Sequence, residues 1–360
     1  MATLHIFNPW HDEALAAGSP YYCPDKAARQ LAADLAEIPK WWAKQGDYIL
    51  IPQDMAPSSP NQLHPTINFI TEKGLPQIVS VIHKISPWGW DALLVNRLTK
   101  WGVPKDLLPN ADQIAKLRDL SSRQTTVAFL QRLRKRLPDH IGESFWCTDM
   151  EEVEKKVSAL SLAMLKAPWS CSGRGVFRTN WPISKLCSGR IQKILRQQGG
   201  IEVEPFYQRT QDFAMEFEVG TEVTYKGLSV FKTHAGGAYL GNLITSEDNL
   251  TAELPNEVAE MLPQTKNAII SLLEEMYAPH YTGPVGIDMM VVEKGNRKIL
   301  HPCIEVNLRN TMGYVACMLH QRMPEIEGIL SIEPLQTLQQ DAICLTPGGK
   351  HLQAIITHRQ

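Results

Sequence analysis

The sequence lacks a strong net charge and long apolar runs, and each absence excludes a class of protein. Its 36 Lys and Arg residues nearly balance 38 Asp and Glu residues, which gives a formal net charge of -2. This balance removes the basic surface on which general nucleic-acid binding depends. No segment approaches the roughly eighteen uninterrupted apolar residues of a membrane span, and the N-terminus shows no signal-peptide pattern. We therefore expect a cytoplasmic protein with neither a nucleic-acid nor a membrane partner.

The sequence also lacks paired cysteines and the standard phosphate-loop motif. Its seven cysteines are odd in number and contain no C-x-x-C pair, which disfavours a disulfide framework or a zinc ribbon and favours a reducing compartment. No G-x-x-x-x-G-K-[ST] loop occurs. What is present is an ordinary globular composition, with 44% hydrophobic and 21% charged residues. A length of 360 residues predicts two or three domains.

The order of apolar and helical patterns predicts an α/β layer followed by α+β segments. Strand-like runs over 4–7, 48–51 and 78–82 alternate with helical patterns over 28–38 and 91–101, a β-α-β rhythm typical of a mainly parallel sheet. Gly and Pro residues then place a boundary near residue 110. Beyond it we expect two helices over 111–137, divided near Ser121, which is the expected N-cap of the second. A helix over 149–160, a strand over 162–165 that ends in Lys166, strands over 201–206, 212–219, 222–233, 285–292 and 298–306, and a helix over 256–277 follow. The predicted segments are 1–110, 111–200, 201–330 and a C-terminal extension, 331–360.

The first chemical pattern is a lysine at the end of an apolar strand, followed by a loop of small residues. Lys166 ends the strand, and the loop contains Ser172, Gly173, Arg174 and Gly175 before a new strand begins at Val176. Glycines let a backbone approach phosphate oxygens closely, and Lys166 and Arg174 would supply cations. The alternative is a hairpin turn with two solvated charges.

The second pattern places carboxylates and an amide at neighbouring strand ends. Asp288 lies in an apolar strand, while Glu305, Asn307 and Arg309 share one face of the next strand by their two-residue spacing. Burying a carboxylate is costly unless a cation meets it, and Mg²⁺ is typically held by such oxygens together with substrate phosphates. A structural ion pair between the carboxylate and Arg309 or Arg297 is the alternative.

Two further patterns are less specific. His301, Cys303 and Glu305 share strand parity and could bind zinc, although His301 precedes Pro302 and no fourth ligand is near. The strand that ends in Glu204 and Phe206 could hold one side of an adenine ring. Asp212, a short loop later, could accept hydrogen bonds from ribose hydroxyls. The alternative is that this alternating strand is simply part of a half-buried sheet.

Taken in order, these motifs resemble the ATP-grasp superfamily. The resemblance covers roughly residues 115 to 320 and rests on the order and spacing of five motifs: the lysine-ended strand with its flap, V-E-P-F at 203–206, D-F-A-M-E-F at 212–217, G-I-D at 286–288 and E-V-N-L-R at 305–309. It implies a Rossmann-like N-terminal domain and two lobes, 111–200 and 201–330, that clasp ATP.

The resemblance also implies roles for single residues. Lys166 would contact the α and β phosphates, Glu204 and its neighbour Phe206 would line the adenine site, and Asp212 would take the ribose role. Asp288, Glu305 and Asn307 would hold Mg²⁺, with Mn²⁺ as an alternative, and Arg309 would face the transferred phosphoryl group.

Two positions depart from the family pattern. Arg123 stands in the helical segment where many members carry a lysine, which keeps the charge but changes the geometry. Gly286 stands where the D-alanine ligases carry an arginine. The arginine two residues after Asn307 instead looks like the biotin-carboxylase and purine-carboxylate branches, so the substrate class stays open.

The sequence therefore predicts an ATP-grasp ligase that phosphorylates a carboxylate and couples it to an amine or similar nucleophile. A catalytically silent nucleotide-binding scaffold and a small-molecule kinase are the alternatives. A homo-oligomer is compatible with all three functions. Substrate contacts are expected from Asn8, His11 and Asp12 after the first strand and from Lys232 and His234. Six of the nine tryptophans lie in the first 101 residues, where they either line a pocket or pack in the core.

Overall fold

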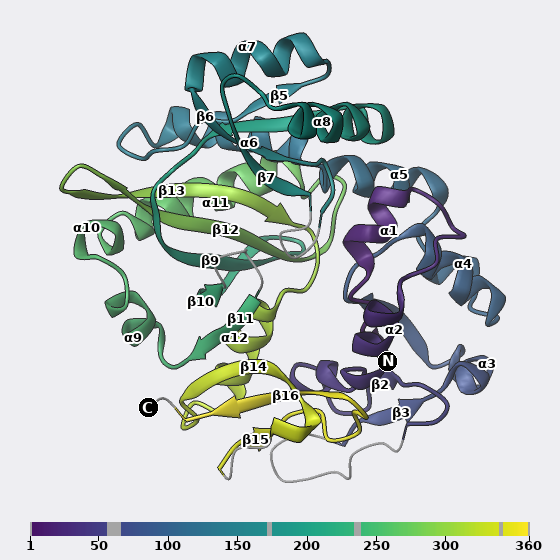
Figure 1. The fold of residues 1–360 in the computed structure, drawn as a ribbon. Helices are drawn as coiled ribbons and strands as arrows, with labels where there is room; N and C mark the ends of the chain where they lie inside the picture. The colour runs from purple at the N-terminus through teal and green to yellow at the C-terminus, as the bar shows by residue number, and fades with distance from the viewer. Residues whose placement is uncertain (1, 56–65, 171–174, 234–238, 338–340, 359–360) are drawn as a thin grey trace.

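The N-terminal part of the chain forms a parallel α/β layer. The computed structural model describes residues 2–55, 66–170, 175–233, 239–337 and 341–358 (Figure 1). The sheet has the order β3-β2-β1-β4 with parallel pairing throughout. Its elements are β1 (Ala2–Ile6), α1 (His11–Ala17), α2 (Lys26–Asp34), the 3₁₀ turn η1 (Ile38–Trp41), β2 (Tyr48–Leu50), β3 (Asn68–Ile70), η2 (Glu72–Gly74), α3 (Leu75–Ile78), β4 (Ile82–Pro87), α4 (Ala92–Lys100) and η3 (Lys105–Leu107).

Apolar residues cover both faces of this sheet, as a parallel sheet requires. Leu4, Ile6 and Ile85 pack with Leu94 and Leu98 of α4 on one face. Ile49 and Ile51 pack with Ala36, just after α2, on the other. The strand predicted over 78–82 is wrong, because Ile78 ends α3 and the strand begins at Ile82. A short apolar run does not by itself distinguish a buried helix turn from a strand.

Two helices then lead to the next part of the chain: α5 (Ala111–Leu120) and α6 (Arg123–Arg136). The break between them falls where it was predicted, but the N-cap is Ser122, whose hydroxyl accepts from the Gln124 backbone N–H. Ser121 is instead the C-cap of α5. Because Ser122 caps α6, Arg123 is the first residue of that helix.

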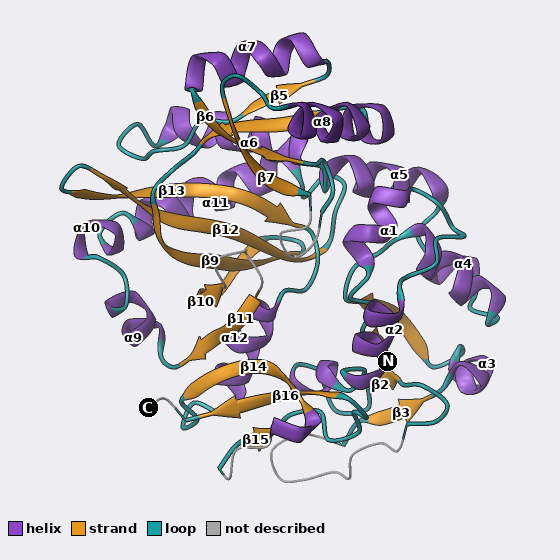
Figure 2. Ribbon diagram, viewed as in Figure 1, coloured by secondary structure: helices purple, strands orange, loops and turns teal. Residues whose placement is uncertain are grey.

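A small antiparallel sheet follows, with the order β5-β8-β6-β7. Its elements are β5 (Phe145–Cys147), α7 (Met150–Leu160), β6 (Leu162–Lys166), β7 (Val176–Asn180), α8 (Lys185–Gln198) and β8 (Ile201–Pro205). Leu165, Ile201 and Val203 pack against α7 and α8 on one face. Figure 2 shows α7 and α8 next to the strands β5 and β6 of this sheet. Alternation along a strand places Lys166, Glu202 and Glu204 on the face opposite the apolar residues.

The rest of the chain builds an eight-stranded sheet with the order β13-β12-β9-β10-β11-β14-β16-β15. Its elements are β9 (Arg209–Val219), β10 (Val223–Thr233), β11 (Tyr239–Ile244), α9 (Glu247–Ala252), α10 (Asn256–Ala259), α11 (Leu262–Met276), β12 (Gly283–Lys294), β13 (Arg297–Asn307), α12 (Met312–Arg322), β14 (Gly328–Pro334), η4 (Leu335–Thr337), β15 (Ile343–Cys344) and β16 (Leu352–Thr357). The helix predicted over 256–277 is divided, because Pro263 lies in the first turn of α11 and favours a new helix start there.

Alternate residues of β9 point to opposite faces of this large sheet. Phe213, Met215 and Phe217 belong to the largest apolar core, as their alternation predicted, and α6 and α11 contribute to the same core. Asp212 and Glu216 consequently point to the other face. Within the described part of the chain, no helix combines the length and apolarity that a membrane crossing requires.

The C-terminal strands join the large sheet and contact the N-terminal layer. β14 pairs with β11, and β16 pairs with β14. The indole N–H of Trp41 donates to the Leu345 carbonyl, and the Asp34 carboxylate accepts from the backbone N–H groups of residues 350 and 352. The first and last parts of the chain are therefore packed together.

Candidate active site

Arg123 joins the two sheets at the site where the predicted residues meet. From the first turn of α6 its guanidinium reaches Glu202 of the small sheet (Nη1 to Oε2, 3.7 Å) and Glu305 of the large sheet (Nη2 to Oε2, 2.7 Å). Burial alone would lower the pKa of Arg123, but Glu305 and the other acids raise it. Arg123 is thus a fixed cation between the lobes.

Lys166 lies in the same cluster, on the small-sheet side. Its Nζ is 2.8 Å from Glu204 Oε1 and 3.6 Å from Glu202 Oε1, and all three side chains are buried. Burial would lower the pKa of Lys166, yet the two glutamates raise it, so the ammonium stays charged. Burial raises the pKa of Glu204, with Glu202 acting in the same direction and Lys166 opposing it.

The three predicted oxygen ligands lie together on β12 and β13. Asp288 is directly opposite Glu305 in the antiparallel pair, and Asn307 follows two residues later on the same strand. Burial, together with the neighbouring Glu305 charge, raises the pKa of Asp288 to about 7. Adjacent carboxylates with an amide oxygen are a donor set that suits a hard divalent cation, which would relieve this repulsion.

The structure does not support the zinc alternative. Within the described parts of the chain, neither ring nitrogen of buried His301 has a hydrogen-bond partner, and burial lowers the pKa of this histidine to about 3. Across the described residues, no group of three or more His, Cys, Asp or Glu side chains could hold a metal ion. His301 instead packs edge-on against Tyr207, with ring centres 5.4 Å apart.

Arg309 is held by a carboxylate from the N-terminal layer. Its Nε donates to both Asp12 oxygens at 3.0 and 3.1 Å, and its Nη2 lies 2.9 Å from Asp12 Oδ2. The same Nη2 donates to Asn307 Oδ1 at 3.0 Å. Burial would raise the pKa of Asp12, but Arg309 lowers it. The structure therefore brings together Asp12 and Arg309, which lie 297 positions apart.

Three other predicted site residues, Asp212, Phe206 and Lys232, form no side-chain hydrogen bond or ion pair with this cluster in the part of the chain that the structure describes. Asp212 accepts from Thr233 Oγ1 and pairs with Arg209, each at 2.8 Å. Phe206 is 43% exposed, with the Arg178 guanidinium 5.6 Å from its ring centre. Lys232 lies near the end of β10 and is exposed.

Two predicted substrate contacts are used for packing instead. Asn8 and His11 are fully buried. The Asn8 amide donates to the Gly89 carbonyl and to Asp91, and His11 lies against Gly89. Gly175 adjoins the flap, whereas Ser172, Gly173, Arg174 and His234 lie outside the described residues.

The sequence analysis assigned no site role to two acidic residues of this region, Glu202 and Glu216. Glu202 lies opposite Lys166 in the β6–β8 pairing, and its parity with Glu204 was the available signal. Glu216 is a buried carboxylate inside an apolar strand, the same signal that singled out Asp288. Its Oε1 accepts from Thr311 Oγ1 at 2.7 Å.

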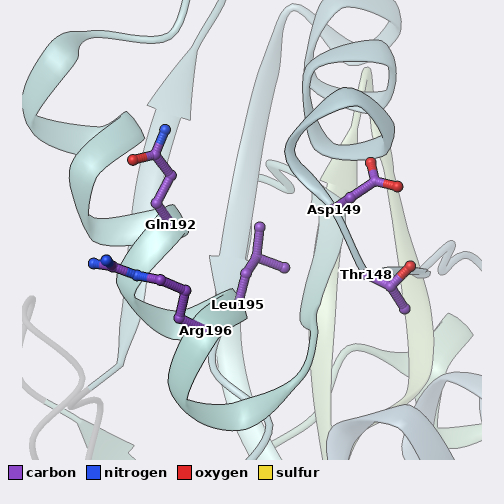
Figure 3. A pocket seen from close by; sticks show the side chains of 5 residues that line it. All are labelled: Thr148, Asp149, Gln192, Leu195 and Arg196. Carbon is purple, nitrogen blue, oxygen red and sulfur yellow. The ribbon is translucent and has the colours of Figure 1, made fainter.

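A separate hollow of about 350 Å³ lies on the helix-covered side of the small sheet. Figure 3 shows its lining residues, Thr148, Asp149, Gln192, Leu195 and Arg196. Lys166 and Glu202 lie on the opposite face of that sheet, so this hollow is not part of the charged cluster.

Solved structures resemble the whole chain. No family model and no curated protein sequence matches it. Biotin carboxylase from Campylobacter jejuni in a β,γ-ATP complex aligns with a TM-score of 0.56 at 12% identity, over 99% of this chain and 88% of that one. N5-carboxyaminoimidazole ribonucleotide synthetase from Thermus thermophilus aligns with a TM-score of 0.52 at 14% identity, over 100% and 94%. The N5-carboxyaminoimidazole synthase from Aspergillus clavatus, in complex with ADP and 5-aminoimidazole ribonucleotide, aligns with a TM-score of 0.53 at 13% identity, over 99% and 94%.

These similarities establish the architecture. The chain shares the overall fold of these solved structures, and the mixed α/β and α+β fold class predicted from its motifs is confirmed. The identities of 12 to 14% carry no further information about substrate.

Proposed function

We propose that the chain is an ATP-dependent ligase of the ATP-grasp type. It would phosphorylate a substrate carboxylate with MgATP and couple the acyl phosphate to an amine or similar nucleophile. The observation that carries this proposal is the charged cluster between the sheets. In this cluster Arg123 contacts Glu305, which lies with Asp288 and Asn307 in the oxygen set, and Arg123 and Lys166 share Glu202 as a partner. Such an arrangement suits a nucleotide whose phosphates carry a divalent metal.

In the first step a carboxylate oxygen attacks the γ-phosphorus of ATP, and the bond to the β-phosphate oxygen breaks to release ADP. Phosphoryl transfer needs mostly positioning and charge stabilisation from the protein. Lys166 and Arg123 would bind the non-transferred phosphates, and Arg309 would bind oxygens of the transferred group. Asp288, Glu305 and Asn307 would hold Mg²⁺, which neutralises phosphate charge when bound.

In the second step the nucleophile attacks the acyl carbon, inorganic phosphate leaves with the C–O bonding electrons, and the amine loses a proton. Several structural neighbours are described with ADP, and one of them with ADP and 5-aminoimidazole ribonucleotide. Another is a 2-oxoglutarate carboxylase domain with MgADP and bicarbonate. These ligands support small-molecule carboxylate and amine substrates for this chain, which we propose to act in the cytoplasm.

The metal assignment is tested by Glu305→Gln with Glu293→Gln as its matched control. Glu293 lies on the paired strand and forms an ion pair with Lys298 at 3.2 Å, away from the cluster. A ligand that binds only the folded state raises the melting temperature. We expect MgATP to do so for the wild type and for Glu293→Gln, and expect Glu305→Gln to lose the magnesium-dependent part of the shift.

The outcome also separates the alternatives. No shift with any nucleotide at millimolar concentration would contradict the proposal, and an unchanged magnesium response in a folded Glu305→Gln would remove this residue from the site. If the first substrate alone supports many turnovers of ADP release per enzyme molecule and accumulates as a phosphorylated product, the protein is a kinase. Binding without turnover by any substrate mixture would favour the scaffold.

A further inference from the structure

A second cavity, of about 360 Å³, opens at the carboxyl ends of β1 and β2 between α2 and α4. In open α/β sheets this edge is where ligands bind. None of its lining residues belongs to the charged cluster of Arg123, Lys166, Asp288, Glu305 and Asn307. The nucleotide and metal contacts proposed above do not involve it either.

The walls of this cavity are apolar and aromatic. Phe7, Trp10 and Trp101 line it, together with small and aliphatic residues of α2 and α4. Phe7 and Trp10 are themselves buried, so the rings are fixed by packing. Two of the six N-terminal tryptophans thus line a pocket. Rigid aromatic walls favour a planar or otherwise apolar ligand body.

The polar groups of the cavity are mainly cationic. Arg29 and Arg97 line it, and exposed Glu72 supplies the one carboxylate among its described lining residues. Burial lowers the pKa of Arg97, with the charge of Asp91 opposing. Its guanidinium carbon lies 4.9 Å from the Trp10 ring centre. No carboxylate of the described residues lies within ion-pair distance of Arg97 or Arg29.

Burial of a guanidinium is costly unless anionic groups meet it. The charges of Asp91 and Glu72 only partly offset the effect of burial on Arg97. Arginine on an aromatic face presents its planar donors edgewise, which suits a carboxylate or a phosphate. The position of the cavity also links it to catalysis, since Trp10 directly precedes α1, and Asp12 in the first turn of α1 holds Arg309.

We propose that this cavity binds the nucleophile-bearing substrate, as a small anion with a planar apolar body whose carboxylate or phosphate lies between Arg29 and Arg97. Its role as a substrate site rests on the proposed ligase function, whereas its capacity to bind an aryl anion does not. This anion would bind in the N-terminal layer, whereas the nucleotide would bind at the charged cluster between the small and large sheets.

Titration calorimetry with phenyl phosphate, benzoate and inorganic phosphate tests the proposal. We expect saturable binding of at least one aryl anion, with inorganic phosphate weaker because it fills no apolar wall. Arg97→Gln should weaken the aryl anion by roughly tenfold or more through loss of a charge-assisted hydrogen bond. Arg132→Gln, at an exposed position on α6, is the matched control and should bind as the wild type does.

Comparison of benzoate with phenyl phosphate identifies the preferred anion. Arg29→Gln changes an exposed residue and provides a second variant if Arg97→Gln fails to fold. Absence of binding at millimolar probe, or binding as tight as that of the wild type in both arginine variants, would overturn the proposal.

Thermal shifts with MgATP, measured on the same samples, test the ligase proposal separately from the cavity proposal. Probe binding without a nucleotide shift would contradict the ligase, and a nucleotide shift without probe binding would contradict only the cavity.

Discussion

Glu216 shows how single glycines make room for a buried acid. Its side chain is 1% exposed, and Oε2 has no hydrogen-bond partner among the described residues. A Cβ on Gly286 would lie 2.9 Å from Oε2, and one on Gly313 would lie 2.2 Å from Oε1. A larger residue at either position would collide with the carboxyl group. Gly286, a departure from one branch of the family, therefore has a packing reason in this chain.

The stability of the protein should depend on pH through Glu216. Burial raises the pKa of Glu216 to about 8, against the hydrogen bond from Thr311. Between the unfolded pKa near 4.5 and this folded value, the native state holds a proton that the unfolded state has lost. Stability contributed by this group is thus complete below pH 4.5 and falls as pH rises to about 8, on the order of 1 kcal/mol per pH unit.

Glu216→Gln mimics the protonated acid, so it should remove this dependence and be more stable than the wild type at pH 8. Urea denaturation at several pH values measures the effect. Glu222→Gln, in the exposed turn between β9 and β10, is the control and should follow the wild-type profile. Equal pH profiles for Glu216→Gln and wild type would show that the buried carboxyl does not control this slope.

At the scale of elements, the β6–β7 hairpin carries Lys166 at the base of the flap. The backbone N–H of Ala167 donates to the Gly175 carbonyl at 3.0 Å, directly beyond the Lys166–Val176 pair. Gly175 has a φ of +88°, and a Cβ there would lie 3.0 Å from the Ser170 Cβ. Glycine is needed at this position because side chains disfavour that backbone region.

Two glycine-to-alanine substitutions should have opposite effects. Gly175→Ala should destabilise the protein by about 1 to 2 kcal/mol, and it should reduce the thermal shift with MgATP because Lys166 adjoins the distorted hairpin. Gly189→Ala, in the exposed interior of α8 where nothing lies within 4 Å, should stabilise by up to ~1 kcal/mol. Denaturant unfolding and nucleotide titration of both variants measure this. Unchanged stability and nucleotide response in Gly175→Ala would contradict the argument for a strained hairpin.

Helices and strands could be predicted where a local pattern of apolar residues alone determined them. Alternation identified β9 and its inward Phe213, and the apolar strand predicted over 162–165 is β6, which begins at the same residue and includes Lys166. Pairing was not predictable, because register depends on partners distant in sequence. The Lys166–Glu202 opposition and the contact of Arg123 with Glu305 therefore required the structure.

At the scale of the whole molecule, the N-terminal layer holds the loop that follows the candidate metal ligands. The Asn310 backbone N–H donates to the Trp88 carbonyl at 2.8 Å, and its side-chain amide donates to the Pro87 carbonyl at 3.2 Å. Asp12 binds the preceding Arg309. The N-terminal layer thus holds Arg309, the proposed catalytic group that follows β13 of the large sheet, a relation that no local sequence pattern contains.

Asp12→Asn should therefore impair catalysis more than nucleotide binding. The substitution keeps the side-chain shape but removes the charge that holds the Arg309 guanidinium, and a small misplacement of a catalytic group can lower turnover by about 10- to 100-fold. Because Lys166 and Arg123 do not contact Asp12, we expect the KM for ATP to change by no more than about twofold, within ordinary context dependence. Steady-state ADP release with the substrate pair measures both constants, and Asp112→Asn on the exposed face of α5 is the matched control. Wild-type kcat in Asp12→Asn would show that Arg309 keeps its position without this partner, and a raised KM with unchanged kcat would assign Asp12 to nucleotide binding instead.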